Sequence, residues 1–242
     1  MKTIDRKGFL KSLGLAGVTA LAAPVLMHCG KNEEDSSTAV IDNSIATACA
    51  VTNSETEGPF PTKTPSSLIQ QNIVSDRTGV PFTIALTVQN AKANCANLQG
   101  AIVDIWHCDK DGNYSEYGGS GMQSTNYTSV HFLRGRQTTD ANGKVNFTSI
   151  FPGWYNGRAT HIHVHVYSTS GQSLLVTQIA FPEGNDSAVV LVGASSGYKG
   201  MSGYTYNSND NVFSDGTSNE MSSISGSVSG GFALTHTIKV SV

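Results

Sequence analysis

Short strand-like runs, several of which alternate apolar and polar residues, follow one another through most of the chain. Alternation with a period of two is typical of strands that have one face on a hydrophobic core and the other toward solvent. The runs lie at residues 80–88, 101–108, 144–150, 160–167, 174–181, 188–193 and 232–240. Because they are short and are separated by turn residues, they predict an all-β fold: a single-domain antiparallel β-sandwich with long loops.

The connections between these runs carry the residues that tight turns require. The segments "DKDGN" (109–113) and "DANGK" (140–144) contain Asp-Gly and Asn-Gly pairs, which favour the turns of β-hairpins. From residue 194 to residue 231 the chain is rich in Ser, Gly and Asn. We expect this stretch to form long loops over the sandwich rather than a second domain.

The first thirty residues follow a different pattern. A basic start precedes a largely apolar stretch over residues 9–27 and then Cys29, which predicts an export signal over residues 1–28. The segment "DRKGFLK" resembles a twin-arginine export motif with Lys7 in place of the second arginine. The segment "VLMHC" resembles the cleavage box of a lipoprotein, although His28 is unusual at its position.

These features predict that Cys29 carries a lipid. A plain secretory signal cut near Ala22 or Ala23, and an uncleaved anchor, are the alternatives. The polar residues 29–47 then form a flexible tether, and residues 48–242 form the folded domain. The expected location is the bacterial cell envelope, periplasmic or surface-exposed, with a lipid anchor as the only contact with the membrane.

Charge adds one exclusion to this picture. The whole chain has a formal charge of −3, and removal of residues 1–28 leaves 11 basic and 17 acidic residues, a formal charge of −6. A mildly acidic domain of this kind has no basic face for a nucleic acid. We therefore expect no nucleic-acid partner.

Export also places the cysteines in an oxidising medium, where disulfides persist. Three cysteines remain after Cys29, so one disulfide and one thiol are expected. Cys49 and Cys95 lie beside turn-rich segments, whereas Cys108 lies in an apolar strand. We therefore favour a Cys49–Cys95 disulfide, and the absence of a CxxC pair makes a cysteine zinc site a weak alternative.

The stretch "RATHIHVHVY" (158–167) places three histidines at alternate positions, namely His161, His163 and His165. On a strand these side chains share one face, while Ile162, Val164 and Val166 share the other face, toward the core. The first and third histidines are then about 13 Å apart along the strand, too far for both to bind one metal at about 2.1 Å. A flat strand therefore supplies two metal ligands at most, and exposed histidines without a metal are the alternative.

Two tyrosines lie close to these histidines in the sequence. Tyr114 follows a Gly turn after an apolar strand in "WHCDKDGNYSEYG", and Tyr155 lies in the Pro-Gly loop "FPGWYNGR" before the histidine strand. Taken singly, each tyrosine is more often a packing residue than a chemical one.

Taken together, several motifs resemble the intradiol ring-cleavage dioxygenases. The segments "TEGPF", "AIVDIWHCDKDGNYSEY", "FLRGRQTTDANGKVNF", "IFPGWYNGRATHIHVHVY" and "VTQIAF" occur in the order found in that family. The likeness covers residues 49–193 well and the remaining tail more loosely, and it is strongest to the exported single-domain members. The six-residue step from Tyr155 to His161 departs from the protocatechuate dioxygenases, which carry an insertion there.

The resemblance implies a site as well as a fold. It implies one non-haem iron(III) per chain, bound by two tyrosines and two histidines, with an arginine and a glutamine beside the metal and two residues that line or support the substrate pocket. Ferric iron favours anionic oxygen donors, which suits tyrosinates. The implied ligands are Tyr114, Tyr155, His161 and His163; the implied catalytic residues are Arg158, Gln178 and Tyr155; the implied pocket residues are Pro59 and Trp106.

The activity that the resemblance implies is cleavage of a catechol between its two hydroxylated carbons, with O2, to a cis,cis-muconate-type dicarboxylate. Catechol and O2 are then the expected small-molecule partners. One alternative is a metal- or ligand-binding β-sandwich module without enzymatic activity on the cell envelope. Another is a zinc or copper site made by the three histidines, which leaves Tyr114 and Tyr155 unexplained.

Overall fold

The computed structural model describes residues 49–195 and 197–242, and within this part the chain forms two β-sheets. The first sheet contains β1 (Pro81–Asn90), β2 (Ala96–Asn97), β5 (Lys144–Ile150), β8 (Ser223–Ser227) and β9 (Gly231–Val240). The second contains β3 (Ile102–Trp106), β4 (Arg134–Thr138), β6 (His161–Tyr167) and β7 (Ser173–Ala180). The short helices are η2 (Pro65–Ser67), η3 (Ala91–Ala93), α2 (Ala188–Gly193) and η4 (Asn207–Asn209).

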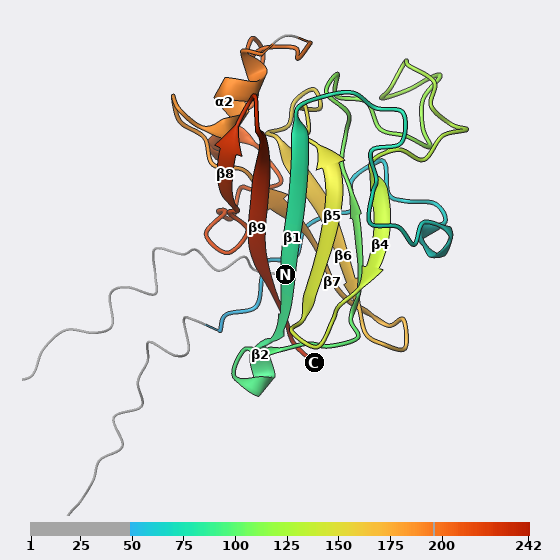
Figure 1. The fold of residues 1–242 in the computed structure, drawn as a ribbon, viewed down its shortest axis with the longest axis vertical. Coiled ribbons are helices and arrows are strands. Elements are labelled where there is room, and N and C mark those ends of the chain that lie inside the picture. Colours follow the sequence, from blue (N-terminus) through green and yellow to red (C-terminus); the bar gives the residue numbers. More distant parts are fainter. Residues whose placement is uncertain (1–48, 196) are drawn as a thin grey trace, which may run out of the picture. The chain divides into compact units, whose positions relative to one another are not determined.

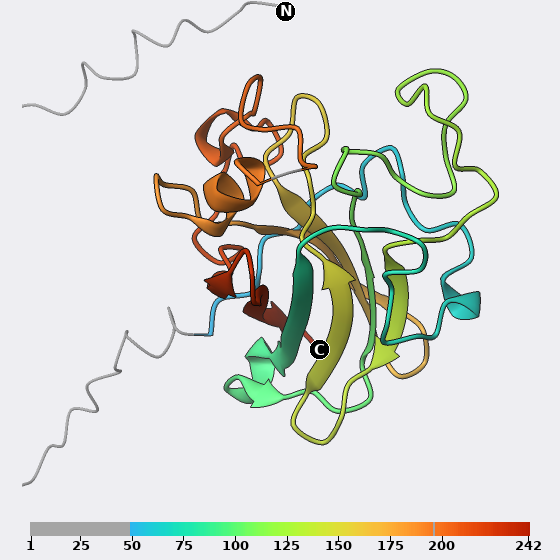
Figure 2. The ribbon, with the colours of Figure 1, turned by 45° about the horizontal axis from the view of Figure 1, so that its top comes forward.

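The order of strands in the second sheet is β4-β3-β6-β7, and all of its pairs are antiparallel. In the first sheet β1 pairs with β5 on one side and with β9 on the other. Figures 1 and 2 show β1, β5 and β9 lying over β6 and β7 as two layers. The predicted sandwich is therefore confirmed, although the β1–β9 pair is parallel rather than antiparallel.

The core lies between the two layers and follows from the alternation in the sequence. In β1 every second residue from Phe82 to Val88 is buried, and in β6 the three apolar residues that alternate with the histidines have no exposed surface. Because successive side chains on a strand point to opposite faces, these positions meet across the sandwich. The core residues from these two strands are Phe82, Ile84, Leu86, Val88, Ile162, Val164 and Val166.

One predicted strand is wrong: residues 188–193 form the helix α2. The run "AVVLVG" has no alternation, so its pattern does not separate a strand from a buried helix. The side chain of Ser187 accepts a hydrogen bond from the backbone N–H of Val190 and caps the helix. Val189 and Val192 then fall on one face and are both buried, whereas Leu191 is exposed.

Other differences concern one turn and three strands. The "DANGK" turn forms, since Gly143 donates to the carbonyl of Asp140. It does not close a hairpin, because it takes the chain from β4 in one sheet to β5 in the other. The sequence pattern also missed β4, β8 and the two-residue β2, and β8 lies in the stretch expected to contain only loops.

A disulfide joins Cys49 to Cys95, and Cys108 is a buried free thiol. The predicted export signal, lipidated Cys29 and tether all lie outside the described residues. Among residues 49–195 and 197–242, none of the helices has the length and apolarity that a membrane span requires.

Candidate metal centre

Two of the three histidines on β6 point to one place, and the third does not. The Nε2 atoms of His161 and His163 are 3.1 Å apart, and both side chains are buried. His165 lies at the other end of the strand, where it contacts Ser173, Tyr167 and Glu57. This arrangement agrees with the expectation that a strand supplies two ligands at most.

The hydroxyl of Tyr114 completes a cluster of three donor atoms. It lies 3.0 Å from Nε2 of His161 and 3.3 Å from Nε2 of His163. Two ligand atoms at about 2.1 Å from one metal, at a right angle, are about 3.0 Å apart. The three separations therefore match neighbouring positions around a single metal ion.

The protonation of these groups also suits a metal. Nδ1 of His161 donates to the carbonyl of Ala159 at 2.6 Å, which leaves Nε2 with a free lone pair. Burial, followed by the charge of Arg158, lowers the pKa of His161 to about 3. Burial also lowers the pKa of His163 well below its usual value. Both imidazoles are therefore neutral, as metal ligands must be.

Burial has the opposite consequence for the phenol. It raises the pKa of Tyr114 well above the usual value for tyrosine, and the nearby Cys108 adds to this effect. A buried phenolate is therefore costly unless a cation compensates it. A bound metal ion supplies that compensation by lowering the pKa of the group that coordinates it.

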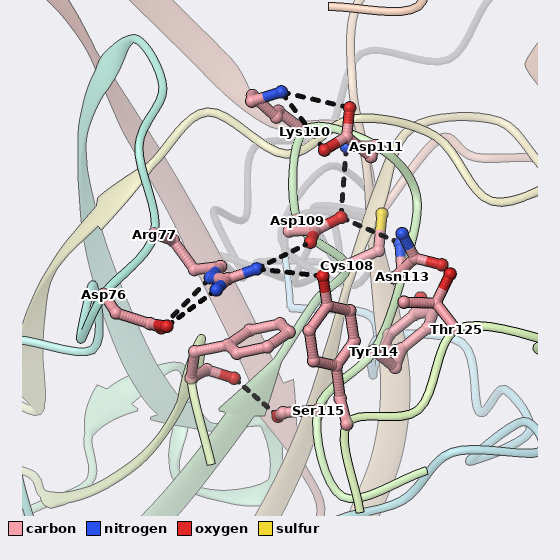
Figure 3. Close-up of polar contacts among 12 residues, drawn as sticks. Asp76, Arg77, Cys108, Asp109, Lys110, Asp111, Asn113, Tyr114, Ser115 and Thr125 are labelled. Atoms are coloured by element: carbon pink, nitrogen blue, oxygen red, sulfur yellow. Dashed lines mark hydrogen bonds and ion pairs between the residues drawn. The ribbon is translucent and has the colours of Figure 1, made fainter. Parts of the chain in front are cut away.

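The loop between β3 and β4 brings Tyr114 to the histidines. Oδ1 of Asp109 accepts hydrogen bonds from the backbone N–H groups of Asp111 and Asn113, at 3.0 and 2.9 Å. Figure 3 shows this turn with Arg77 on its other side, and Nη1 of Arg77 is 3.4 Å from Oδ2 of Asp109. The "DKDGN" segment thus forms an Asp-centred turn whose next residue is the candidate ligand.

Tyr155, the fourth expected ligand, is outside the three-atom cluster. Its hydroxyl donates to the carbonyl of Met122 at 2.8 Å. Its ring is 6.0 Å from the ring of Tyr114 and 5.3 Å from that of Phe60. The side chain therefore borders the centre, while its oxygen is held by the neighbouring loop.

Arg158 and Gln178 lie together beside the cluster. Nη2 of Arg158 donates to Oε1 of Gln178 at 2.6 Å, and Nη1 lies 3.5 Å from Nε2 of His161. Gln178 also donates through Nε2 to the carbonyl of Thr56 at 2.8 Å. The pair therefore places a fixed positive charge next to the histidines.

Sequence reasoning missed the main partner of Arg158, which is Asp210. Nε of Arg158 is 2.8 Å from both carboxylate oxygens of Asp210, and that carboxylate is fully buried. It also accepts from the backbone N–H groups of Ala159 and Val212. Asp210 lies in the polar stretch assigned to loops, outside every motif that carried the family resemblance, so no local signal pointed to it.

The two expected pocket residues have different positions. Trp106 is buried and stacks on the ring of His163, with centroids 4.9 Å apart and planes at 1°. Pro59 is exposed, between Gly58 and Phe60. Phe60 stacks on Tyr114 at 4.9 Å, and a Cβ on Gly58 would lie 3.1 Å from the His163 ring. The "TEGPF" segment therefore covers the centre.

Comparisons with known proteins show that the chain is similar to dioxygenases. The family model described as "Dioxygenase" matches residues 57–212. A solved intradiol ring-cleavage dioxygenase from Tetranychus urticae is 27% identical, with a TM-score of 0.69, over 80% of this chain and 95% of that one. The dioxygenase domain from Streptomyces sp. SirexAA-E is 25% identical, with a TM-score of 0.58, over 80% of this chain and 99% of that one.

Curated relatives match over shorter stretches. The chlorocatechol 1,2-dioxygenase of Rhodococcus opacus is 29% identical, over 35% of this chain and 37% of its own length. The catechol 1,2-dioxygenase 1 of Acinetobacter lwoffii is 30% identical, over 32% of this chain and 29% of its own length. The chain thus matches about a third of the length of these relatives. From its sequence match, its fold and its cluster of phenol and imidazole donors, the chain belongs to the intradiol ring-cleavage dioxygenase family.

Proposed function

We propose that the protein cleaves the ring of a catechol between its two hydroxylated carbons, using O2 and one iron(III) ion per chain. The observation that carries this proposal is the convergence of the Tyr114 oxygen with Nε2 of His161 and His163, within 3.3 Å of one another. A phenolate and neutral imidazoles are donors that suit ferric iron. The alternative site of three histidines finds no support, because His165 faces other partners.

Four residues would hold the metal: Tyr114, His161, His163 and, after rotation of its side chain, Tyr155. Two phenolates would offset most of the charge of the ion, and the two histidines would complete the protein ligands. When bound, iron(III) supplies the Lewis acidity that withdraws electron density from a catecholate ring. The aromatic rings of Phe60 and Trp106 pack around the ligands and keep water away from them.

Tyr155 is the residue best placed to take a proton from the substrate. It borders the centre, and its hydroxyl donates to the carbonyl of Met122. A Tyr155 phenolate beside the entering catechol would accept one of its protons. The new hydroxyl then donates to the Met122 carbonyl, as it does in the structure.

Arg158 would stabilise negative charge that develops on the bound substrate. Its guanidinium is fixed by Asp210 and Gln178, and Nη1 is directed toward the histidines. A cation that is already oriented in a buried site stabilises a transition state without reorganisation. Because Asp210 compensates the charge at Nε, the Nη1 end remains available to the substrate.

The product would be a cis,cis-muconate-type dicarboxylate that contains both atoms of O2. The names of the two curated relatives support a catechol as the substrate class. Ring substituents would be distinguished by loop residues at the rim, where Pro59 and Tyr155 lie.

Purified protein supplied with iron tests the proposal. We expect about one iron per chain, a red-brown colour from tyrosinate-to-iron charge transfer, and one O2 consumed per catechol cleaved. Iron content, the visible spectrum and oxygen uptake with a panel of catechols measure these three quantities. Colourless protein that binds no iron and consumes no O2 would instead favour a binding module without enzymatic activity.

We also propose that the protein is exported and anchored by a lipid on Cys29, on the strength of the signal-like pattern over residues 1–28. Fractionation of cells that express the full chain tests this. The wild-type protein should enter the detergent phase and the Cys29→Ser variant should not. Equal partition of both would contradict lipidation.

A further inference from the structure

A second cluster of metal-ligand side chains lies away from the donors of the iron site. Glu55, Asp215 and Glu220 each place one carboxylate oxygen within 4.8 Å of the others. These residues come from distant parts of the chain that β7 brings together. Glu55 donates its backbone N–H to the carbonyl of Val176 at 2.9 Å, and the carbonyl of Glu220 accepts from the N–H of Ala180 at 3.0 Å.

Glu220 is the unusual member of this cluster, because its side chain is completely buried. Its Oε1 accepts a hydrogen bond from the hydroxyl of Thr177 at 3.1 Å. Its Oε2 is also buried and finds no hydrogen-bond partner in the described part of the chain. A buried carboxylate oxygen without a partner is costly, so this atom requires a proton or a cation.

Direct ion pairs do not offset the negative charge of this cluster within the described residues. None of the three carboxylates forms a salt bridge with the basic residues of the described chain. One oxygen of Asp215 accepts from the side-chain amide of Asn53 at 2.9 Å. Three carboxylates that share a small volume without a counter-ion repel one another. A bound divalent cation removes that repulsion and supplies the missing partner of Glu220.

We propose that Glu55, Asp215 and Glu220 bind a calcium ion. Calcium takes six to eight oxygen ligands at about 2.3–2.6 Å, so ligands on opposite sides of it are about 4.6–5.2 Å apart. The three oxygens lie within 4.8 Å of one another, close enough to surround one such ion. Magnesium demands a near-ideal octahedron and keeps several of its water ligands, so three protein carboxylates, one of them fully buried, favour calcium. Water molecules would complete the shell on the side of the exposed Asp215.

The position of this site indicates what the ion does. Glu55 belongs to the segment that continues into Gly58 and Phe60, which cover the iron site. Thr177, the partner of Glu220, precedes Gln178, which binds the carbonyl of Thr56. Calcium would therefore link the segment that covers the iron site, residues 55–60, to strand β7. The calcium site includes no proposed iron ligand, so calcium binding can be tested independently of the oxygenase activity.

Thermal unfolding of the full-length protein, with and without CaCl2 and free of other divalent ions, tests the proposal. At calcium about 100-fold above the Kd, binding to the folded state alone should raise Tm by roughly 5–10 °C. Calorimetric titration with calcium should give one ion per chain. No rise in Tm and no binding at millimolar calcium would overturn the proposal.

Variants assign the binding to these residues. Glu220→Gln keeps the shape of the side chain and should abolish the calcium-dependent rise in Tm. Asp215→Asn, at an exposed position where folding is not at stake, should weaken binding at least tenfold. Asp186→Asn, at an exposed acidic residue before α2, is the matched control and should retain the full rise. An undiminished rise in Glu220→Gln and Asp215→Asn would place the ion elsewhere and overturn the assignment.

Discussion

The two clusters of ligand side chains differ in how much they destabilise the folded chain when no metal is bound. Around His161, His163 and Tyr114 the groups are neutral, because burial lowers the pKa of the imidazoles and raises that of the phenol. Around Glu55 and Glu220 the groups are carboxylates, and burial, followed by the negative neighbours, raises the pKa of Glu220. A neutral cluster persists without its ion, whereas a charged one must take up a proton or a cation.

This difference separates activity from stability. Changes at the neutral cluster should remove iron and catalysis while the fold remains, because the sandwich core does not depend on those donors. Changes at the acidic cluster should alter the free energy of unfolding and leave the colour of bound iron in place. The following variants test that separation, from the largest expected effect to the smallest.

Tyr114→Phe should have the largest effect on activity. It removes the ligand oxygen but keeps the ring that stacks on Phe60, so the iron affinity should fall by more than the 10–100-fold typical of losing an outer-shell partner. Iron content, the charge-transfer band and oxygen uptake should all be lost, with Tm within a few degrees of the wild type. Retained colour and turnover would contradict the role of Tyr114 as a ligand.

Asp210→Asn should lower turnover while the iron stays bound. The substitution keeps the size of the side chain but removes the charge that compensates Arg158 at 2.8 Å. We expect kcat to fall by about 10–100-fold, with a smaller change in KM, because the guanidinium acts on charge that develops in the transition state.

Two controls separate positioning from folding at Asp210. Iron content and the visible spectrum of Asp210→Asn should match the wild type, and Asp210→Glu should recover part of kcat by restoring the charge. Unchanged kcat in Asp210→Asn would show that Arg158 does not depend on this carboxylate.

The sequence predicted the parts of the site that lie in regular strands and in motifs. The face shared by His161 and His163 follows from the period of two, because alternate side chains on a strand project to the same side. Asp210 and the parallel pairing of β1 with β9 were not predictable in this way. Both depend on where a long polar stretch returns to the sandwich, which the local pattern does not encode.

Metal-free protein should become less stable as the pH rises through the neutral range. The pKa of Glu220 is raised to about 8 by burial and then by Glu55 and Asp215, from an ordinary value near 4.5. Between these two values the folded chain holds a proton that the unfolded chain releases, so the stability contributed by this proton is lost as pH rises from about 4.5 to 8.

The test is the difference in free energy of unfolding between the wild type and Glu220→Gln, measured by denaturant at several pH values. The free energy of unfolding of the variant should rise relative to that of the wild type from pH 5 to pH 8, and the difference should stay constant above pH 8. Saturating calcium should restore the stability of the wild-type protein at high pH. A pH-independent difference would show that Glu220 does not titrate in this window.

His165→Ala should have the smallest effect, and it tests whether the polar face of β6 beyond His163 belongs to either cluster. His165 stacks on Tyr167 and contacts Glu57 at 3.1 Å, outside both sets of donors. Loss of such a partly exposed contact costs about 1 kcal/mol or less, which lowers Tm by roughly 2–4 °C. Iron content, colour and the calcium-dependent rise in Tm should be unchanged. His163→Ala, two residues away on the same face, should remove the colour, so the two variants together show whether His163 is the last metal ligand on the strand. Loss of iron from His165→Ala would extend the metal centre along the strand and contradict the assigned ligands.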